Sequence, residues 1–235
     1  MNVIESENLT KHYRQGDHTV HAVDGVTLAI AKGEFVSLVG RSGSGKTTFL
    51  DCIGLLMRPT SGRLTIDGED TGAMSDGRRA IFRSRKLGFV FQDFNLLDSL
   101  TALENVLLPV RYAGLDRKAA RGRAMELLEE LEVADRAEHR PNQLSGGEKQ
   151  RLAIARSLIN QPSIVLGDEP TGNLDSGTSN RLIAVLRRFN KERGVTFVIV
   201  THDKDLASRT DRVVDLRDGK VIADGPPASK VGLAA

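Results

Sequence analysis

The sequence contains one cysteine, Cys52, among 235 residues, which excludes an intrachain disulfide framework and is typical of a reducing compartment. It also lacks long hydrophobic runs. Apolar stretches such as Val195–Val200 are far shorter than the ~20 residues that a membrane-spanning helix needs. The first residues are acidic and polar, without the basic and apolar regions of a secretory signal. We therefore expect a chain that does not cross a membrane by itself.

A strong excess of charge of either sign is also missing. Lys and Arg total 33 and Asp and Glu total 31, which gives a net charge of +2. Proteins that bind nucleic acids usually carry a basic stripe, because neutralisation of phosphates dominates their affinity. Here the two signs are interspersed, so we expect no nucleic-acid partner. Hydrophobic residues make up 40% of the chain, which is enough for the core of one globular domain.

The hydrophobic pattern changes along the chain. Alternation over the first thirty residues predicts antiparallel strands, interrupted at Gly16 and at Asp24-Gly25. Apolar runs at 34–39, 163–167 and 195–200 predict buried strands, and the last two flank a helical stretch around 181–190. Because strands alternate with helices there, a mainly parallel sheet is favoured. From about 101 to 160 helical spacing takes over, and the Asp-Gly pairs at 67–68 and 218–219 predict hairpin turns.

A glycine-rich loop follows the first apolar strand. Gly40–Thr47 matches the pattern G-x-x-x-x-G-K-[ST] in full, between a predicted strand and a predicted helix. Glycines let backbone N–H groups approach phosphate oxygens, and the following helix directs its positive end towards them. Lys46 would contact the β- and γ-phosphates, and the Thr47 hydroxyl would ligate Mg²⁺. The predicted nucleotide-binding residues of this loop are Gly40, Ser42, Gly43, Ser44, Gly45, Lys46, Thr47 and Thr48.

Two adjacent carboxylates, Asp168 and Glu169, end the next apolar strand. Open α/β sheets bind ligands at the carboxyl edge of their strands, so both side chains should face the nucleotide. Asp168 is suited to hold Mg²⁺, and Glu169 to polarise the attacking water. The alternative is an acidic pair that caps a helix.

A second candidate for anion binding is Ser145-Gly146-Gly147, which precedes a helical run at 151–156. Free N–H groups, a hydroxyl and a helix dipole would attract phosphate there. Ordinary helix capping is the competing interpretation.

Leu144–Gln150 resembles the signature motif of ATP-binding-cassette (ABC) ATPases, and other elements of that family follow in its order. Tyr13 resembles the aromatic residue that stacks on adenine, and Gln92 the glutamine that reaches Mg²⁺ and senses a transmembrane partner. Asp175 belongs to a segment that is similar to the loop crossing the dimer interface, and His202 resembles the histidine that contacts the γ-phosphate. The similarity extends over roughly 3–225.

The resemblance implies an α/β fold with a P-loop NTPase (RecA-like) core, an antiparallel β subdomain and a helical insertion subdomain. We predict one domain, 1–235, with the core and β subdomain in 1–92 and 161–235 and the helical subdomain in 93–160. It also implies ATP and Mg²⁺ as ligands, with Thr47, Gln92 and Asp168 at the metal. Glu169 would be the catalytic base, and Lys46, His202, Ser145 and Gly147 would stabilise developing charge.

In this family two nucleotide-binding subunits pair head to tail, so each ATP lies between the phosphate loop of one subunit and the Ser-Gly-Gly turn of the other. The resemblance therefore implies a homodimer and an integral-membrane permease as partners, with the chain peripheral at the cytoplasmic face of the inner membrane. Phe94, Leu96, Leu97 and Leu100 could form the permease surface or a small core.

The amino-acid sequences of residues 88–97 and 171–176 are similar to those of the branch of the family that serves lipoprotein release and macrolide export. The alternative within the family is a regulatory ATPase of the cell-division type, which drives a membrane partner without moving cargo. A soluble cassette acting in DNA repair or on ribosomes is less compatible, since the chain carries neither a long coiled-coil insertion nor a second cassette.

Overall fold

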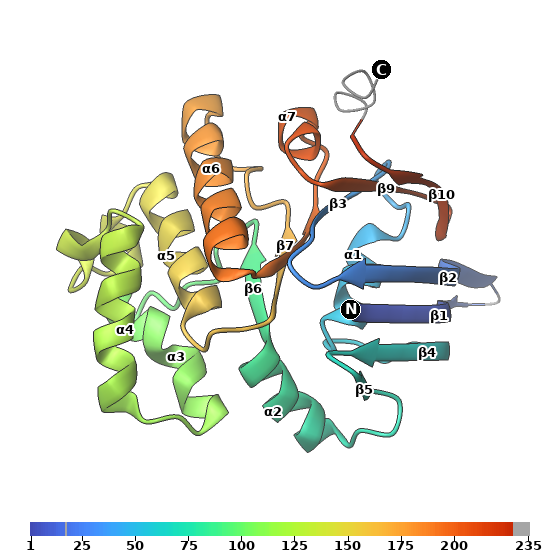
Figure 1. Ribbon diagram of the computed structural model, residues 1–235, viewed down its shortest axis with the longest axis horizontal. Coiled ribbons are helices and arrows are strands. Elements are labelled where there is room, and N and C mark those ends of the chain that lie inside the picture. Colours follow the sequence, from blue (N-terminus) through green and yellow to red (C-terminus); the bar gives the residue numbers. More distant parts are fainter. Residues whose placement is uncertain (17, 228–235) are drawn as a thin grey trace.

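The computed structural model describes residues 1–16 and 18–227, so the end of the predicted domain, 228–235, lies outside the described residues. A six-stranded sheet runs through the middle of the molecule in the order β10-β9-β3-β8-β7-β6 (Figure 1). Its five neighbouring strands β9, β3, β8, β7 and β6 are parallel, and β10 pairs antiparallel with β9. Their bounds are β3 (Phe35–Val39), β6 (Leu87–Phe91), β7 (Ile164–Asp168), β8 (Thr196–Val200), β9 (Arg212–Arg217) and β10 (Lys220–Gly225). Strands covered on both faces need continuous apolar runs, and this explains the sequence pattern.

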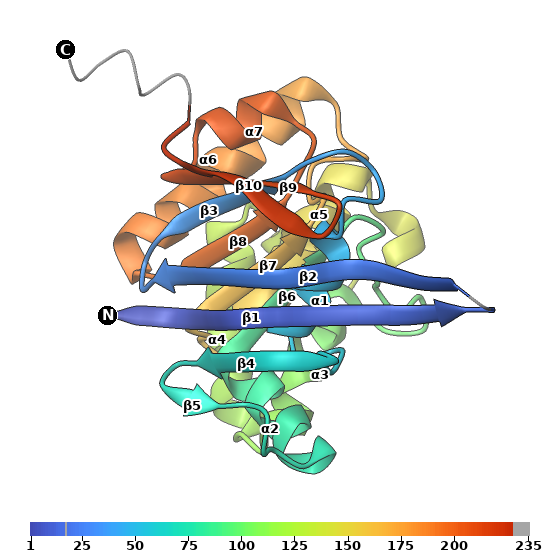
Figure 2. The ribbon, with the colours of Figure 1, turned by 90° about the vertical axis from the view of Figure 1, so that its right-hand side faces the viewer.

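The predicted antiparallel sheet is present beside the first one, in the order β2-β1-β4-β5 (Figure 2). Its strands are β1 (Asn2–Gln15), β2 (His18–Ala31), β4 (Ser61–Ile66) and β5 (Glu69–Asp70). The interruption predicted at Asp24-Gly25 is wrong, because β2 runs through it. Leu9 pairs with Val26 and Lys11 with Val23, so β2 has one residue more than β1 between these pairs. The pair forms a β-bulge, which accommodates residues that otherwise read as a turn.

Both predicted hairpin turns are confirmed. Asp67 and Gly68 connect β4 to β5, and Asp218 and Gly219 connect β9 to β10. All four residues have positive φ, as two-residue type I′ turns require.

The helices are α1 (Lys46–Ile53), α2 (Asp76–Lys86), α3 (Ala102–Ala113), α4 (Arg117–Glu130), α5 (Gly146–Leu158), α6 (Ser176–Arg193) and α7 (Lys204–Ser208), with short 3₁₀ turns at 134–136 and 141–143. The helical character predicted for 101–160 is confirmed by α3, α4 and α5. The sequence pattern did not reveal α2. That helix buries only Arg79 and Phe82, so its apolar stripe is too short to stand out. The division at residues 92 and 160 stays a prediction.

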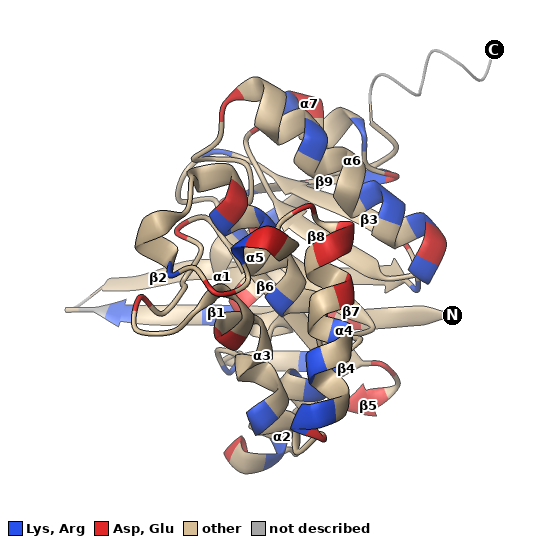
Figure 3. Cartoon of the chain, turned by 90° about the vertical axis from the view of Figure 1, so that its left-hand side faces the viewer, with Lys and Arg blue, Asp and Glu red and all other residues tan. Residues whose placement is uncertain are grey.

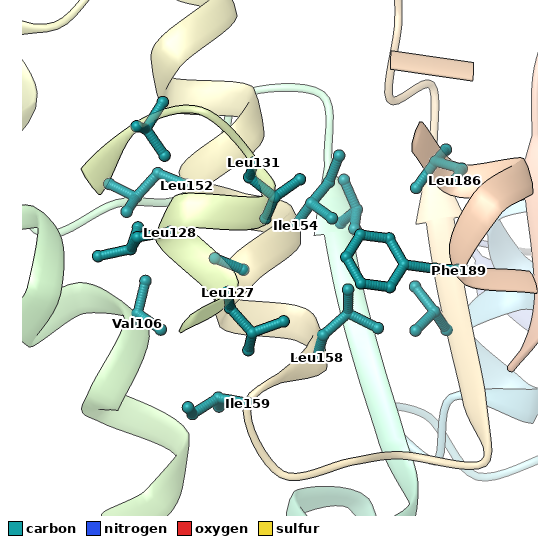
Figure 4. Close-up of a cluster of buried hydrophobic side chains, with 14 of the residues drawn as sticks. Val106, Leu127, Leu128, Leu131, Leu152, Ile154, Leu158, Ile159, Leu186 and Phe189 are labelled. Carbon is teal, nitrogen blue, oxygen red and sulfur yellow. The ribbon is translucent and has the colours of Figure 1, made fainter. Parts of the chain in front are cut away.

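One hydrophobic cluster joins these helices to the sheet. Side chains of α3, α4, α5 and α6 meet there (Figure 4). Ala120, Ala124, Leu127, Leu128 and Leu131 follow helical spacing on one face of α4 and its C-terminal end, and all five are buried in the cluster. Leu96 packs partly buried against it, whereas Leu97 is 47% exposed. The apolar residues at 94–100 thus divide between core and surface.

The helical face carries both signs of charge, since basic and acidic residues both occur along α4, α5 and α6 (Figure 3). Within the described part of the chain, no helix combines the length and apolar character needed to cross a bilayer.

Candidate functional site

The glycine-rich loop connects β3 to α1, and Lys46 is the first residue of that helix. Its ammonium group donates to the carbonyl oxygens of Gly40 and Arg41, both at 2.9 Å, and lies 3.5 Å from the Ser44 hydroxyl. The side chain is largely buried. These partners are neutral oxygens, so they position the charge of Lys46 without neutralising it, and the loop is suited to an anion.

Two glycines allow this loop to press against the backbone of neighbouring strands. Gly45 has φ +98°, and a Cβ there would lie 2.0 Å from the Ala22 carbonyl oxygen of β2. Gly40 has φ +143°, and a Cβ there would lie 2.2 Å from the Leu216 carbonyl oxygen of β9. A side chain at either position would force the loop away from the strand that it contacts, so these two glycines are required by the fold as well as by phosphate approach.

The loop and the acidic pair meet, as predicted. The Thr47 hydroxyl donates to Asp168 Oδ1 at 3.4 Å. Burial and the adjacent Glu169 raise the pKa of Asp168. Burial and Asp168 in turn raise the pKa of Asp51, which the sequence reading did not single out. Asp51 lies four residues after Thr47 in α1, and this i, i+4 spacing places it on the same helix face.

The acidic pair is not a helix cap. Asp168 ends β7, and the next helix begins at Ser176 with Asp175 as its N-cap. Glu169 has φ +47°, and its backbone N–H donates to the Val200 carbonyl of β8 at 2.9 Å. This conformation turns the carboxylate towards the end of β8.

His202 lies at that end and holds the Glu169 carboxylate at two points. Its Nδ1 lies 2.9 Å from Oε1, and its backbone N–H donates to Oε2 at 3.3 Å. The structure thus brings together two residues that were assigned to the site separately. An anchored carboxylate at the edge of a phosphate-binding loop can orient a water molecule.

Gln92 follows β6 and lies against the segment after the acidic pair. A Cβ on Gly172 would lie 3.3 Å from its Nε2, and Asn173 Nδ2 donates to its carbonyl oxygen at 3.0 Å. After Asp93, Phe94 and Asn95 both have positive φ.

Arg156 of α5 holds that left-handed pair. Its guanidinium donates to the Phe94 carbonyl at 2.6 Å and to the Asn95 carbonyl. Burial lowers the pKa of Arg156 to about 10. The sequence reading missed this contact, because nothing in it marks two consecutive non-glycine residues as left-handed.

Ser145 is the N-cap of α5, which begins at Gly146, so this turn lies at a helix start as predicted. Its hydroxyl accepts from the Glu148 N–H at 3.3 Å, and the Glu148 carboxylate accepts from the Ser145 N–H at 2.8 Å. The capping interpretation is thus confirmed in the single chain. A Cβ on Gly147 would lie 3.0 Å from Thr178 Cγ2, so this turn packs on the start of α6. In Figure 1, α5 and α1 stand well apart.

Asp175 and Tyr13 complete the predicted set. Asp175 caps α6 by accepting from the Thr178 N–H at 3.0 Å and hydroxyl at 2.7 Å, and these hydrogen bonds lower its pKa. Tyr13 is 37% exposed on β1. Its hydroxyl lies 2.8 Å from Met57 Sδ, and Lys11 Nζ lies 5.4 Å from its ring centre.

The capping box at Ser145 gives a prediction about acid. The hydrogen bond from Arg136, together with those from Ser145, lowers the pKa of Glu148 to about 2. A depressed carboxyl pKa stabilises the fold above the unfolded value, near 4.5, and that contribution is lost as the pH falls towards about 2. We expect Glu148→Gln to lower the free energy of unfolding at pH 7, and the deficit to shrink below pH 4.5. Urea unfolding at several pH values measures this. Glu126→Gln, at an exposed site on α4, should show no such trend, and a deficit for Glu148→Gln that is constant with pH would contradict the assignment.

Comparison with known protein families identifies the family of this chain. A sequence model of the family described as "ABC transporter" matches residues 23–172, which is more than half of the chain. The chain belongs to the ABC transporter family. It is an ATP-binding-cassette ATPase with the mixed α/β fold of a P-loop NTPase.

Relatives within the family are of two lengths. The chain is 48% identical over 222 residues to "Lipoprotein-releasing system ATP-binding protein LolD" of Porphyromonas gingivalis, covering 94% of this chain and 100% of the relative. It is 45% identical over 242 residues to "Macrolide export ATP-binding/permease protein MacB" of Syntrophobacter fumaroxidans, covering all of this chain and 34% of the relative. The cassette therefore spans about one third of the MacB relatives and the whole of this LolD relative.

Among solved structures, the cassette is similar to "the ATP-binding cassette MJ0796 bound to ADP and Pi", described as a dimeric post-hydrolysis state. The TM-score is 0.88 at 44% identity, covering 95% of this chain and 98% of that one. This similarity confirms the predicted fold class and the resemblance on which the site assignment was based.

Proposed function

We propose that this chain is the ATP-hydrolysing subunit of a membrane transport system and that it drives a separate integral-membrane permease. ATP would occupy the loop around Lys46, whose charge is held by neutral carbonyl oxygens. Tyr13 would supply the adenine contact from its half-exposed position on β1. The remaining phosphate-loop residues would donate backbone N–H groups.

Mg²⁺ fits the oxygen donors at the end of β7. Thr47 Oγ1 and Asp168 Oδ1 are already 3.4 Å apart, and Asp51 and Glu169 add negative charge nearby. Hydroxyl, carboxylate and amide oxygens are the ligands that Mg²⁺ prefers. Thr47, Asp168 and Gln92 would hold the ion, which supplies neutralisation of phosphate charge.

Hydrolysis would be an in-line attack of water on the γ-phosphate. Glu169 would orient and polarise the water, since its carboxylate is fixed by both the ring and the backbone of His202. Lys46 and His202 would stabilise charge that develops on the phosphoryl oxygens. The single observation that carries this assignment is the Glu169–His202 pair beside the Thr47–Asp168 contact.

A second copy of the chain would complete each site. The Ser145-Gly146-Gly147 turn packs on α6 of its own chain through Gly147 and Thr178. It begins α5, which lies well apart from α1, the helix that carries Lys46 of the same chain (Figure 1). The turn can therefore serve a partner's nucleotide as a helix N-terminus with free N–H groups. Two chains in head-to-tail arrangement would enclose two ATP molecules, and Asp175 would lie near the interface.

The permease would dock in a groove of about 450 Å³ between α2, β6, α3 and α5. Its lining is mostly apolar, and Tyr112, 67% exposed, stands at its surface. Asn95 and Arg156 also line it. A segment seated there would press on the strained residues that follow Gln92, and Gln92 contacts Gly172 beside the acidic pair. Movement of the permease and of the nucleotide site would be coupled through this loop.

By similarity to the LolD and MacB relatives, the work done would be export or membrane extraction. The chain would sit peripherally at the cytoplasmic face of the inner membrane, held there by its permease.

Tyr112→Asp tests the groove. A charge at this position should disfavour docking of an apolar segment, because the docked segment would strip water from the carboxylate. We expect the variant to lose copurification with an integral-membrane protein from native membranes and to lose ATPase stimulation by that protein, while its basal ATPase rate is unchanged.

Ile222→Asp is the matched control, since Ile222 is 48% exposed on β10, away from the groove. It should retain both properties. If Tyr112→Asp still copurifies and is still stimulated, the groove is not the permease site.

A further inference from the structure

A pair of histidines faces one another on the long hairpin of the antiparallel sheet. His12 of β1 pairs directly with His21 of β2, and these strands lie side by side (Figure 2). Their ring centres are 3.9 Å apart. Residues directly opposite on antiparallel strands project to the same face, so both imidazoles belong to one cluster.

A second β-bulge brings a carboxylate to this pair. Lys11 pairs with Val23 and His12 with His21, so Ala22 is an extra residue of β2 and places His21 and Asp24, three positions apart, on the same face. One ligand atom each of His12, His21 and Asp24 lies within 4.8 Å of the other two. The bulge itself is fixed, since the Asp24 N–H donates to the Gly219 carbonyl at 2.9 Å.

The cluster is incompletely satisfied. His12 Nε2 is buried and has no hydrogen-bond partner, and buried polar atoms normally have one. Asp24 has a charged neighbour in Lys220, whose ammonium group lies 3.3 Å from Asp24 Oδ2. Lys220 is 63% exposed, so it can turn into solvent when a cation replaces it.

We propose that His12, His21 and Asp24 form a binding site for a divalent first-row transition metal such as Zn²⁺. Two imidazoles and one carboxylate are a common ligand set for these ions. Metal–ligand bonds of about 2.0–2.1 Å place tetrahedral ligand atoms roughly 3.3 Å apart. Rotation of the side chains would bring ligand atoms that now lie within 4.8 Å of one another to that spacing, and water would fill the remaining position.

A metal there would tie β1 to β2 beside the nucleotide site without being part of it. His12 precedes Tyr13, and the residue after His21, Ala22, presents its carbonyl to Gly45 of the phosphate loop. The site is distinct from the hard-oxygen donors at Thr47 and Asp168, and it needs no nucleotide.

Calorimetric titration of the untagged, metal-free protein with ZnCl₂ in excess MgCl₂ tests the proposal. We expect one strongly bound equivalent of Zn²⁺. His12→Ala and His21→Ala should each weaken it by more than about tenfold, and Asp24→Asn should also weaken it. His18→Ala, on the same hairpin but outside the cluster, should bind as the wild type does.

Two further measurements separate loss of the metal site from misfolding of a variant and from binding at His202. Nitrogen-15 NMR of histidine-labelled wild-type protein should show Zn²⁺ shifting two of the five imidazoles, which requires no variant to fold. His202→Ala should leave the strong binding intact. The proposal is overturned if no equivalent binds strongly, if the hairpin variants bind normally, or if His202→Ala removes the binding.

Discussion

Replacing Glu169 by glutamine should lower the rate of ATP hydrolysis by at least about 100-fold, because that is the usual contribution of a positioned general base. The amide has nearly the shape of the carboxylate, so the contacts with His202 Nδ1 and with the His202 backbone N–H can be largely retained. It cannot accept a proton from water. Binding of ATP should therefore survive, and the enclosed dimer should accumulate because it cannot proceed to products.

Phosphate release, equilibrium ATP binding and size-exclusion chromatography with MgATP measure the three parts of this prediction. Glu192→Gln is the matched control, since Glu192 is exposed near the end of α6, and it should behave as the wild type does. Normal turnover in Glu169→Gln would remove the proposed role of this carboxylate. Lost ATP binding would show that the residue acts mainly in shaping the site.

Lys46→Ala should act on an earlier step and weaken ATP binding itself. The Lys46 ammonium is buried against the carbonyl oxygens of Gly40 and Arg41, where water screens it poorly. Losing one partner of a desolvated charge pair costs about 2 kcal/mol or more, which corresponds to at least about 30-fold in affinity. Hydrolysis would fall as a consequence.

Equilibrium binding of a fluorescent ATP analogue measures this effect. Lys32→Ala removes an exposed lysine and should change nothing. Thermal unfolding without nucleotide shows whether the loop of Lys46→Ala still folds. A well-folded variant that binds ATP with wild-type affinity would contradict the assignment of the loop.

The sequence predicts the parts of the site that have local signals better than the parts that depend on tertiary contacts. Gly40–Thr47 and Asp168-Glu169 were predictable because strand ends and helix starts have local signals, and their residue types follow from phosphate and Mg²⁺ chemistry. The parallel sheet followed from apolar runs of the length that a doubly covered strand needs. The Glu169–His202 contact could be expected from two adjacent strands, β7 and β8, that end at the same edge.

Features set by tertiary contacts were out of reach. Arg156 stabilises left-handed residues at 94–95 across more than sixty positions, and the sequence there contains no glycine. Asp24-Gly25 has the composition of a turn, yet pairing of the flanking Val23 and Val26 with β1 keeps it in a strand. The sequence of the signature turn is compatible with both phosphate binding and helix capping, and in one chain Ser145 caps its own helix. A nucleotide at that turn would be bound by a second chain, which the sequence of one chain does not describe.

The central claim is that each nucleotide is enclosed by Lys46 of one chain and Ser145 of another. Mixing Lys46→Ala with Ser145→Arg, each inactive alone, tests it most directly. Head-to-tail pairing puts both defects in one site and leaves the other intact, so ATP hydrolysis should return. Random pairing makes half of the dimers mixed, and the rate should approach about a quarter of the wild-type value if sites act independently. Failure of the mixture to hydrolyse ATP, although mixed dimers are shown to form, would contradict the shared site.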